Sequence, residues 1–319
     1  MKAVAIQSFG GPEGLAVIDA PDIEPAEGQV LIATEAIGVG FVDAMIRSGA
    51  LADFGFKEGY VPGSEIAGAV TAIGIGVDPS LLGKRVWAFI GKGGYAERGI
   101  ASAKALVPLP ADLSTVDAVT LGSSGIVAHF GLRHARFAPS ESVLVRGAAG
   151  GIGVIVVQLA ARGGASVVAV TASSTERGDR LRKLGATHVL NRAGEGAAGV
   201  PQGYDVIIDI VGGADTPSLF AKLNPNGRIV AVGAVAGFPP TDFAKEMFPA
   251  FQKSLSFATF SAATVSEAER LATVATLFAA AGQGELESVV QEVLPLGQAV
   301  QAHRKLEAGG VFGRLALRP

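Results

Sequence analysis

The sequence predicts an α/β protein in which a β-rich region is followed by a doubly wound parallel sheet. From Lys2 to about Val107 the apolar stretches are short, often alternate with polar residues and are separated by glycine and proline, which is typical of strands. From Asp112 onwards, segments of helical length alternate with compact apolar strands, which is the pattern of βαβ units around a parallel sheet. The chain has 319 residues, which corresponds to about two domains at roughly 150 residues each.

The elements of the second region follow one another in a regular order. Residues 142–147 read as a strand, residues 151–162 as a helix that ends at two glycines, and residues 165–171 as the next strand. Ser173, with Glu176 three residues later, predicts the capped start of a helix. The remaining segments of this region are strands at 187–191, 204–213 and 228–237 and a short helix at 218–223. The tail from about Leu286 again reads as short strands, and we expect it to return to the first domain.

The composition excludes several classes of protein. The 26 lysines and arginines do not outnumber the 29 aspartates and glutamates, so the chain lacks the basic excess that binding to a phosphate backbone requires. The sequence contains no cysteine, which excludes disulfides, thiolate-bound zinc, iron–sulfur clusters and a cysteine nucleophile. We therefore expect no nucleic-acid partner.

The apolar runs do not predict a membrane protein. The most apolar run, residues 147–161, is shorter than a membrane span and is interrupted by glycines and Gln158. The first residues lack the apolar core of a signal peptide, and the last residues carry no lipidation or retention motif. We expect a soluble, cytoplasmic protein.

A glycine-rich loop between the first strand and helix of the second region indicates a dinucleotide site. Residues 148–153 read AAGGIG, a variant of the dinucleotide fingerprint with alanine in place of the first glycine. In it, Gly150 would let the backbone approach a pyrophosphate, Gly153 would let the helix pack on the strand, and the helix N-terminus would bind the phosphates. The alternative is a structural turn, because a chain with 44 glycines produces chance matches. The predicted cofactor contacts of this loop are Ala149, Gly150, Gly151, Ile152 and Gly153.

The end of the next strand favours NADPH over NADH. An NAD site usually has an acidic residue there to bind the ribose hydroxyls, whereas this chain has Thr171, Ala172, Ser173 and Ser174. Arg177 follows this strand, and Arg192 follows the third strand of the region. Both guanidinium groups suit a 2′-phosphate. The alternative is that both arginines are solvated surface residues.

Several motifs together resemble the zinc-independent quinone oxidoreductase (zeta-crystallin-like) branch of the medium-chain dehydrogenase/reductase superfamily. They are VDAMIRSG at 42–49, VPGSEIAGAV at 61–70, GGYAE at 93–97, and VLVRGAAGGIG, LRKLGATHVLN, DVIIDIVGG and GRLAL further along. The resemblance implies a GroES-like substrate domain (1–117 and 286–319), a Rossmann NADPH-binding domain (118–285), an active cleft and a homodimer. It covers essentially the whole chain.

The resemblance also places cleft residues. Zinc-dependent relatives carry Cys or His at three positions that are Gly40, Ser64 and Ser123 here, which do not form a zinc ligand set. The implied substrate cleft contains Gly40, Asp43, Met45 and Ser64. Relatives often have asparagine where Gly40 stands and tyrosine where Met45 stands. Because both are absent here, the identity of the substrate stays open. Asp43 and Glu65 are expected either to take part in the reaction or to form hydrogen bonds that hold the cleft loops in place.

Further contacts are implied around the nicotinamide and the acceptor. Val211, Gly233, Ala234, Phe257 and Phe260 would form the nicotinamide wall, although both phenylalanines can equally be core residues. Arg314 would contact the cofactor. Two residues are candidates for catalysis: Ser124 could hydrogen-bond a substrate carbonyl or merely cap the helix, and His129 could donate a proton or simply pack.

Three functions remain open. The chain has no GxSxG elbow, HExxH motif or P-loop. The first expectation is hydride transfer from NADPH to a small quinone, and the second is reduction of an enone or enoyl thioester. The third is a structural or sensing protein that binds NADPH without turnover.

Overall fold

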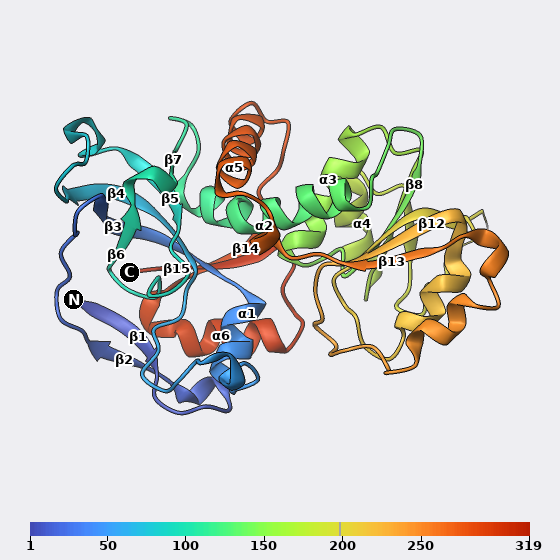
Figure 1. The fold of residues 1–319 in the computed structure, drawn as a ribbon, viewed down its shortest axis with the longest axis horizontal. Coiled ribbons are helices and arrows are strands. Elements are labelled where there is room, and N and C mark those ends of the chain that lie inside the picture. Colours follow the sequence, from blue (N-terminus) through green and yellow to red (C-terminus); the bar gives the residue numbers. More distant parts are fainter. Residues whose placement is uncertain (198) are drawn as a thin grey trace. The chain divides into compact units, whose positions relative to one another are not determined.

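The chain folds into two compact units in a computed structural model that describes residues 1–197 and 199–319. The first unit comprises Met1–Ser123 and Glu267–Pro319, and the second comprises Ser124–Ser266 (Figure 1). Both termini therefore belong to the first unit. These bounds differ from the expected second domain, 118–285, at both ends.

The first unit is built on an antiparallel sheet. Its strands run in the order β14-β15-β3-β4-β5-β7, with β6 also paired to β3 and with only the β14–β15 pair parallel. A separate hairpin joins β1 (Lys2–Ile6) and β2 (Leu15–Asp19). The strands of the main sheet are β3 (Gln29–Val39), β4 (Glu65–Ile73), β5 (Arg85–Phe89), β6 (Arg98–Ser102), β7 (Leu106–Pro108), β14 (Val290–Pro295) and β15 (Arg314–Arg318). The tail from about Leu286, predicted to return to the first region, lies in the first unit, where β15 pairs with β3.

Three helices belong wholly to the first unit: α1 (Phe41–Ser48), α5 (Glu267–Gly282) and α6 (Ala299–Glu307). Helix α5 lies within the region that the sequence assigned to the second domain. It joins the first unit because Phe278 is fully buried and contacts the indole of Trp87 edge-on, with ring centroids 6.2 Å apart. Helix α2 (Thr115–His134) begins in the first unit and continues into the second.

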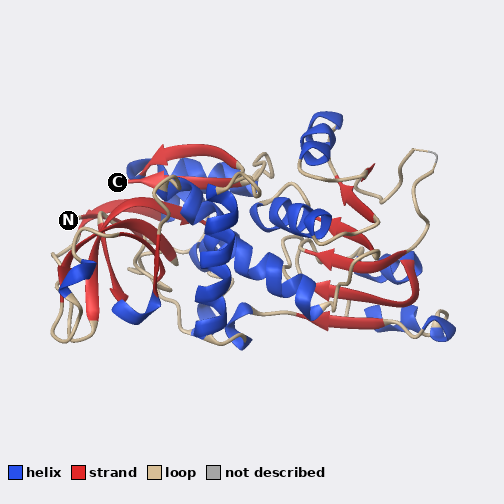
Figure 2. Cartoon of the chain, turned by 90° about the horizontal axis from the view of Figure 1, so that it is seen from above, coloured by secondary structure: helices blue, strands red, loops and turns tan. Residues whose placement is uncertain are grey.

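The second unit contains the predicted doubly wound parallel sheet. Its strands run in the order β10-β9-β8-β11-β12-β13, and every pairing is parallel. Figure 2 shows strands of this sheet side by side, with helices packed along them. This is the strand order of a dinucleotide-binding fold, with the reversal point between β8 and β11. The elements are β8 (Ser142–Arg146), α3 (Gly151–Arg162), β9 (Val167–Thr171), α4 (Thr175–Lys183), β10 (His188–Leu190), β11 (Tyr204–Asp209), β12 (Leu223–Ala231) and β13 (Ser256–Thr259).

One local expectation in this unit needs correction. The N-cap of α4 is Ser174, whose hydroxyl accepts from the Arg177 N–H at 3.3 Å, and not Ser173. The preceding Ser173 accepts a side-chain hydrogen bond from Arg177 instead. The short helix predicted at 218–223 is present as a 3-10 helix, Thr216–Lys222, with a proline in its first turn.

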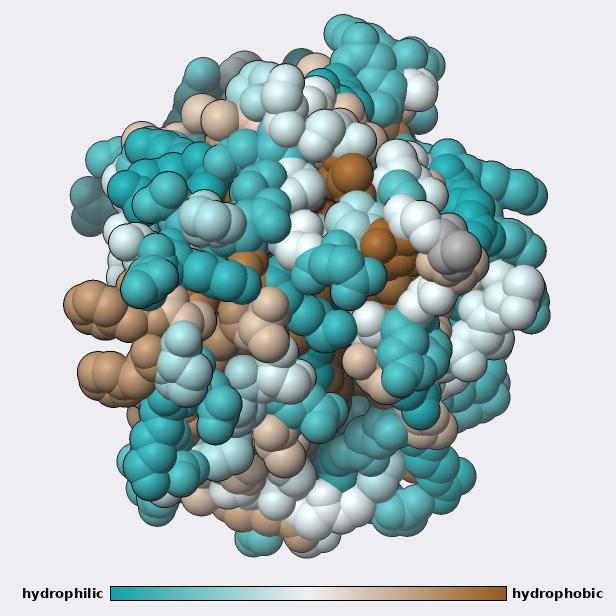
Figure 3. Space-filling view, turned by 90° about the vertical axis from the view of Figure 1, so that its right-hand side faces the viewer, coloured by the Kyte–Doolittle hydropathy of each residue, from teal (hydrophilic) through white to brown (hydrophobic). Residues whose placement is uncertain are grey.

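The surface of the second unit carries several exposed apolar side chains. Phe238, Phe248 and Phe251 are 85%, 74% and 79% exposed. Figure 3 looks onto this unit and shows apolar side chains projecting at one margin among hydrophilic ones. Within the described part of the chain, no helix combines the length and the apolar character needed to cross a membrane.

Candidate active site

The glycine loop connects β8 to α3 at the carboxyl edge of the parallel sheet. It places Ala149, Gly150, Gly151, Ile152 and Gly153 at the N-terminus of α3, with Gly150 as the N-cap residue. The first N–H groups of a helix have no acceptor within the helix, so this end of α3 offers donors to an anion. The structure therefore brings the five predicted residues of the loop together.

The two key glycines of this loop differ in what surrounds them. A Cβ added to Gly153 would lie 2.4 Å from the Gly147 carbonyl oxygen and 2.6 Å from Ala148 Cα, so the packing of helix on strand requires glycine there. A Cβ added to Gly150 would make only an ordinary contact, 3.6 Å from the same oxygen. The protein's own packing thus leaves space at Gly150, which fits the approach of a pyrophosphate.

The end of β9 gathers the polar residues predicted to bind the ribose. Ser173 Oγ accepts from Arg177 Nη1 at 3.4 Å, and Ser174 caps the helix in which Arg177 lies. The Ala172 N–H donates to the Leu190 carbonyl at 2.9 Å, which brings the end of β10 beside the end of β9. Because Arg192 follows Leu190 by two residues, both arginines belong to the same edge of the sheet.

A buried ion pair that the sequence reasoning missed holds the next loops. Asp209, fully buried at the end of β11, accepts from Arg146 Nη1 at 3.1 Å and from the N–H groups of Val211 and Gly212 at 2.9 and 3.1 Å. The Ala236 N–H in turn donates to the Val211 carbonyl at 2.8 Å. The predicted wall residues Val211, Gly233 and Ala234 therefore lie on two connected loops. The sequence feature that could have revealed this ion pair is a charged residue at the end of each of two apolar strands, SVLVR and YDVIID.

The two predicted aromatic wall residues occupy different surroundings. Phe257, on β13, packs against Phe243 and Phe220 with ring centroids 4.9 and 6.1 Å apart, within the aromatic core of the unit. Phe260 follows the strand and lies 5.7 Å from the ring of His134. The role of either residue beside a nicotinamide stays a prediction.

The two candidate catalytic residues lie on α2. Ser124 is buried. His129 lies edge-on to Phe130 at 5.0 Å, and partial burial lowers its pKa, with the nearby charge of Arg133 acting in the same direction. His129 is therefore mainly neutral near pH 7.

In the first unit, Glu65 at the start of β4 is the centre of a hydrogen-bonded cluster. Its Oε2 accepts from Trp87 Nε1 and from the Ser123 N–H, each at 3.0 Å. Its Oε1 accepts from the Ser123 hydroxyl and from Arg314 Nη2, and Arg314 Nη1 also donates to Ser123 Oγ at 3.2 Å. Arg314 thus forms an ion pair with a fully buried carboxylate.

The other predicted cleft residues lie on α1 and on the segments that lead into α1 and β4. Asp43, on α1, accepts from the N–H groups of Gly40 and Gly63 at 2.9 and 3.0 Å and joins two loops. Burial raises the pKa of Asp43 to about 6. Ser64 and Met45 are half-buried, and the Ser64 carbonyl accepts from the N–H groups of Ile90 and Gly91 at 2.8 and 3.0 Å.

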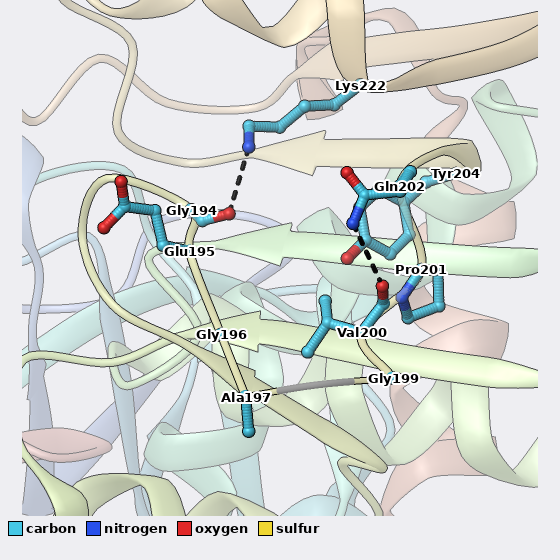
Figure 4. Close-up of a pocket in the computed structure, with 10 residues that line it drawn as sticks. All are labelled: Gly194, Glu195, Gly196, Ala197, Gly199, Val200, Pro201, Gln202, Tyr204 and Lys222. Atoms are coloured by element: carbon cyan, nitrogen blue, oxygen red, sulfur yellow. Dashed lines mark hydrogen bonds between the residues drawn. The ribbon is translucent and has the colours of Figure 1, made fainter.

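A cavity of about 410 Å³ lies elsewhere in the second unit, beneath the loop between β10 and β11 (Figure 4). There the Lys222 ammonium donates to the Gly194 carbonyl at 3.0 Å, and Tyr204 forms part of the wall. The cavity is lined by none of the residues that the sequence predicts for the site, and we assign it no role in the chemistry.

Comparisons with known proteins agree with this architecture. Residues 26–111 match a family described as alcohol dehydrogenase GroES-like domain, and residues 184–317 match one described as zinc-binding dehydrogenase. The quinone oxidoreductase of Rattus norvegicus is 32% identical, over 99% of this chain and 97% of that protein. A 2-haloacrylate reductase of Burkholderia is 29% identical, over 100% of this chain and 99% of that protein. The Escherichia coli quinone oxidoreductase complexed with NADPH is 27% identical, with a TM-score of 0.89 over 100% of both chains.

The residues of this chain do not fit the zinc ion that one family description implies. Gly40 offers no side chain, Ser64 and Ser123 offer hydroxyls rather than thiolates or imidazoles, and the Arg314 guanidinium lies against Ser123. Among residues 1–197 and 199–319, no cluster of three or more His, Cys, Asp or Glu residues could hold a metal ion. With its GroES-like first unit and its Rossmann-like second unit, the chain belongs to the quinone oxidoreductase branch of the medium-chain dehydrogenase/reductase superfamily.

Proposed function

We propose that the chain is an NADPH-dependent oxidoreductase that transfers a hydride to a quinone without a metal ion. The observation that carries the proposal is the edge of the parallel sheet, where the open glycine loop lies next to the end of β9. Residues 171–174 at this strand end include two serines and no acidic residue, and Arg177 and Arg192 follow. The quinone oxidoreductases to which the chain is similar support the choice of acceptor.

The preference for NADPH follows from the charge around β9. Ser173, Ser174 and Arg177 are already connected by hydrogen bonds, and Arg192 follows the end of β10 by two residues. A 2′-phosphate would receive hydroxyl and guanidinium donors there, whereas NADH would leave these donors without an anion. The second unit is therefore the proposed NADPH-binding domain, and the first unit the proposed substrate domain.

In this mechanism the protein binds and orients the reactants. The N-terminus of α3 binds the pyrophosphate, and the Arg146–Asp209 pair holds the loops that carry Val211, Gly233 and Ala234. NADPH, when bound, supplies the hydride. A quinone takes up this hydride and one proton to form the hydroquinone, and water can supply the proton, so no dedicated acid is required. Ser124 is the proposed donor to the acceptor oxygen. His129, the other candidate, is mainly neutral near pH 7 and would have to take up a proton before it could donate one.

A second candidate function is reduction of an activated carbon–carbon double bond. It is favoured by the similarity to the 2-haloacrylate reductase of Burkholderia. In that reaction the hydride adds to the β carbon and a proton adds to the α carbon, so a proton donor such as His129 gains importance. The same fold and cofactor site would serve both reactions.

We further propose that the protein acts in the cytoplasm as a homodimer. Strand β13 lies at the end of the strand order and pairs only with β12 among the described strands, so its other edge is open to a second copy. Pairing of two such edges would extend the sheet and remove an aggregation-prone edge. Light scattering should give about twice the monomer mass of 32.2 kDa, and a mass equal to the monomer would exclude the dimer.

The test of the proposed function is NADPH oxidation, followed by absorbance, with a simple benzoquinone and separately with an enone or an enoyl thioester. Turnover with the quinone supports the proposal, and turnover with the alkene alone supports the second candidate. Absence of both, together with demonstrated NADPH binding, contradicts both and favours a structural or sensing protein.

A further inference from the structure

We propose that Arg314 and Glu65 are positioning residues for the electron acceptor, and that their buried ion pair takes over the organising role that a metal ion would have at this position. The inference rests on the proposed function, because it concerns the acceptor of that reaction. It differs from the expectation that Arg314 contacts the cofactor.

Both oxygens of the Glu65 carboxylate are occupied by hydrogen-bond donors. Its two oxygens accept four hydrogen bonds, from Trp87 Nε1, from the Ser123 N–H, from the Ser123 hydroxyl and from Arg314. Glu65 is 0% exposed and the Arg314 side chain 8% exposed. A carboxylate with donors on both of its oxygens is held in one orientation, so its role is to fix other groups.

The ion pair adjoins the predicted cleft residues. Arg314 Nη1 donates to Ser123 Oγ, while the Ser123 hydroxyl donates to Glu65, so the pair fixes this hydroxyl from both sides. Glu65 directly follows Ser64 in the chain, and a Cβ built on Gly40 would lie 3.9 Å from Arg314 Nη2. Gly40, Ser64 and Ser123, the three positions of the cleft that hold ligands in zinc-dependent relatives, thus all adjoin one ion pair.

The backbone of β3 at Gly38 lies so close to the ion pair that it leaves no room for a side chain. A Cβ on Gly38 would lie 2.6 Å from Glu65 Oε1 and 2.8 Å from Arg314 Nη2, so no larger residue fits on β3 at this point. The guanidinium and the carboxylate therefore pack directly on the strand that leads to Gly40 and α1. Moving either group would shift the backbone that the acceptor is expected to contact.

These contacts predict an effect on the acceptor and not on the cofactor. The hydrogen bonds that join Arg314, Glu65, Ser123 and Trp87 lie within the first unit, whereas the glycine loop and the end of β9 belong to the second. Removing the guanidinium leaves Glu65 buried without its counter-ion and releases Ser123. A displacement of about 1 Å near a reacting group can lower the rate by about 100-fold.

The experiment compares Arg314→Ala with Arg228→Ala. Arg228 is a matched control, because it also forms a largely buried pair, with Glu141, but lies in the second unit. For wild type and both variants, kcat and KM are measured for the quinone and for NADPH, and folding is checked by circular dichroism. Arg314→Ala is then assayed with added guanidinium chloride at low millimolar concentration and with urea, a neutral molecule of similar shape.

We expect Arg314→Ala to lower kcat/KM for the quinone by about 100-fold with KM for NADPH within about twofold of wild type. Guanidinium should restore a large part of the loss and urea should not, whereas neither should change Arg228→Ala. A rise in KM for NADPH with unchanged quinone kinetics would overturn the inference in favour of a cofactor contact. Equal rescue by urea would overturn it as well, because shape alone would then suffice.

A conservative variant keeps the inference testable if Arg314→Ala does not fold. Arg314→Lys retains the charge but loses the fork that contacts Glu65 and Ser123 together, so its kcat/KM for the quinone should fall by about 10-fold. Kinetics equal to wild type in a folded Arg314→Lys protein would overturn the inference. Wild-type protein that binds NADPH but reduces no quinone would instead contradict the proposed function itself.

Discussion

At the scale of single residues, the two glycines of the loop before α3 have separate roles. Gly153 allows the helix to pack against the Gly147 carbonyl, whereas the space at Gly150 is not filled by the protein itself. Folding and cofactor binding are therefore assigned to different residues only three positions apart, and substitution can separate them.

Gly153→Ala should destabilise the fold, and Gly150→Ala should weaken only cofactor binding. The alanine methyl at 153 overlaps the backbone and should cost about 1–3 kcal/mol. At 150 the backbone angles, φ −84° and ψ 170°, suit alanine, so stability should change by less than about 0.5 kcal/mol. Urea unfolding and NADPH titration of both variants test this. Equal cofactor affinity in Gly150→Ala and wild type would contradict the pyrophosphate site.

The two arginines near the end of β9 should determine the choice of cofactor. Removing Arg177 and Arg192 together should raise the Kd for NADPH by about 10- to 100-fold and leave that for NADH almost unchanged, since each arginine is proposed to make a charge-assisted bond to the 2′-phosphate. Arg182→Ala is the control, because it lies on the same helix and pairs with Asp179. An unchanged preference for NADPH in the double variant would contradict the assignment.

At the scale of elements, the packing of α6 introduces a pH dependence. His303 is fully buried on this helix, and its Nε2 lies 3.0 Å from the Tyr95 hydroxyl. Burial lowers the pKa of His303 from 6.5 to about 4, and the charge of Arg47 acts in the same direction. Below pH 6.5 the unfolded chain therefore binds a proton that the folded chain refuses, and stability is lost as the pH falls towards 4.

His303→Gln should reduce this acid sensitivity while keeping a polar partner for Tyr95. The histidine alone should make wild type about 2 kcal/mol less stable at pH 5 than at pH 7, and the variant should lack this difference. The free energy of unfolding in urea at the two pH values measures it, with His188→Gln as control. An identical pH dependence in wild type and His303→Gln would show that the ring is not excluded from protonation.

The elements themselves were largely predictable from the sequence, and their long-range partners were not. Glycines, caps and apolar runs predict β8, α3 and β9 because these signals are local. The assignment of α5 to the first unit depends on the contact between Phe278 and Trp87, which no local pattern reveals. Likewise, Arg314 and Glu65 are 249 residues apart, so their ion pair becomes visible only once β15 lies beside β3.

At the scale of the whole molecule, the two units have different proposed tasks, cofactor binding in the second and acceptor binding in the first. The second unit has the strand order, the open glycine loop and the basic strand end that a phosphorylated dinucleotide requires. The first has a buried ion pair where a metal-dependent relative would need ligands. Together they fit the proposed NADPH-dependent reductase, in which the chain and the cofactor would supply the electrostatic groups.

The most direct test of this account is the rate of benzoquinone reduction by protein from which metals have been stripped with a chelator. We expect full activity in the stripped protein and no gain when zinc is added back. We also expect kcat/KM for NADPH to be at least about 10-fold above that for NADH, which corresponds to about 1.4 kcal/mol from binding of the 2′-phosphate. Activity that disappears on stripping and returns with zinc would contradict it.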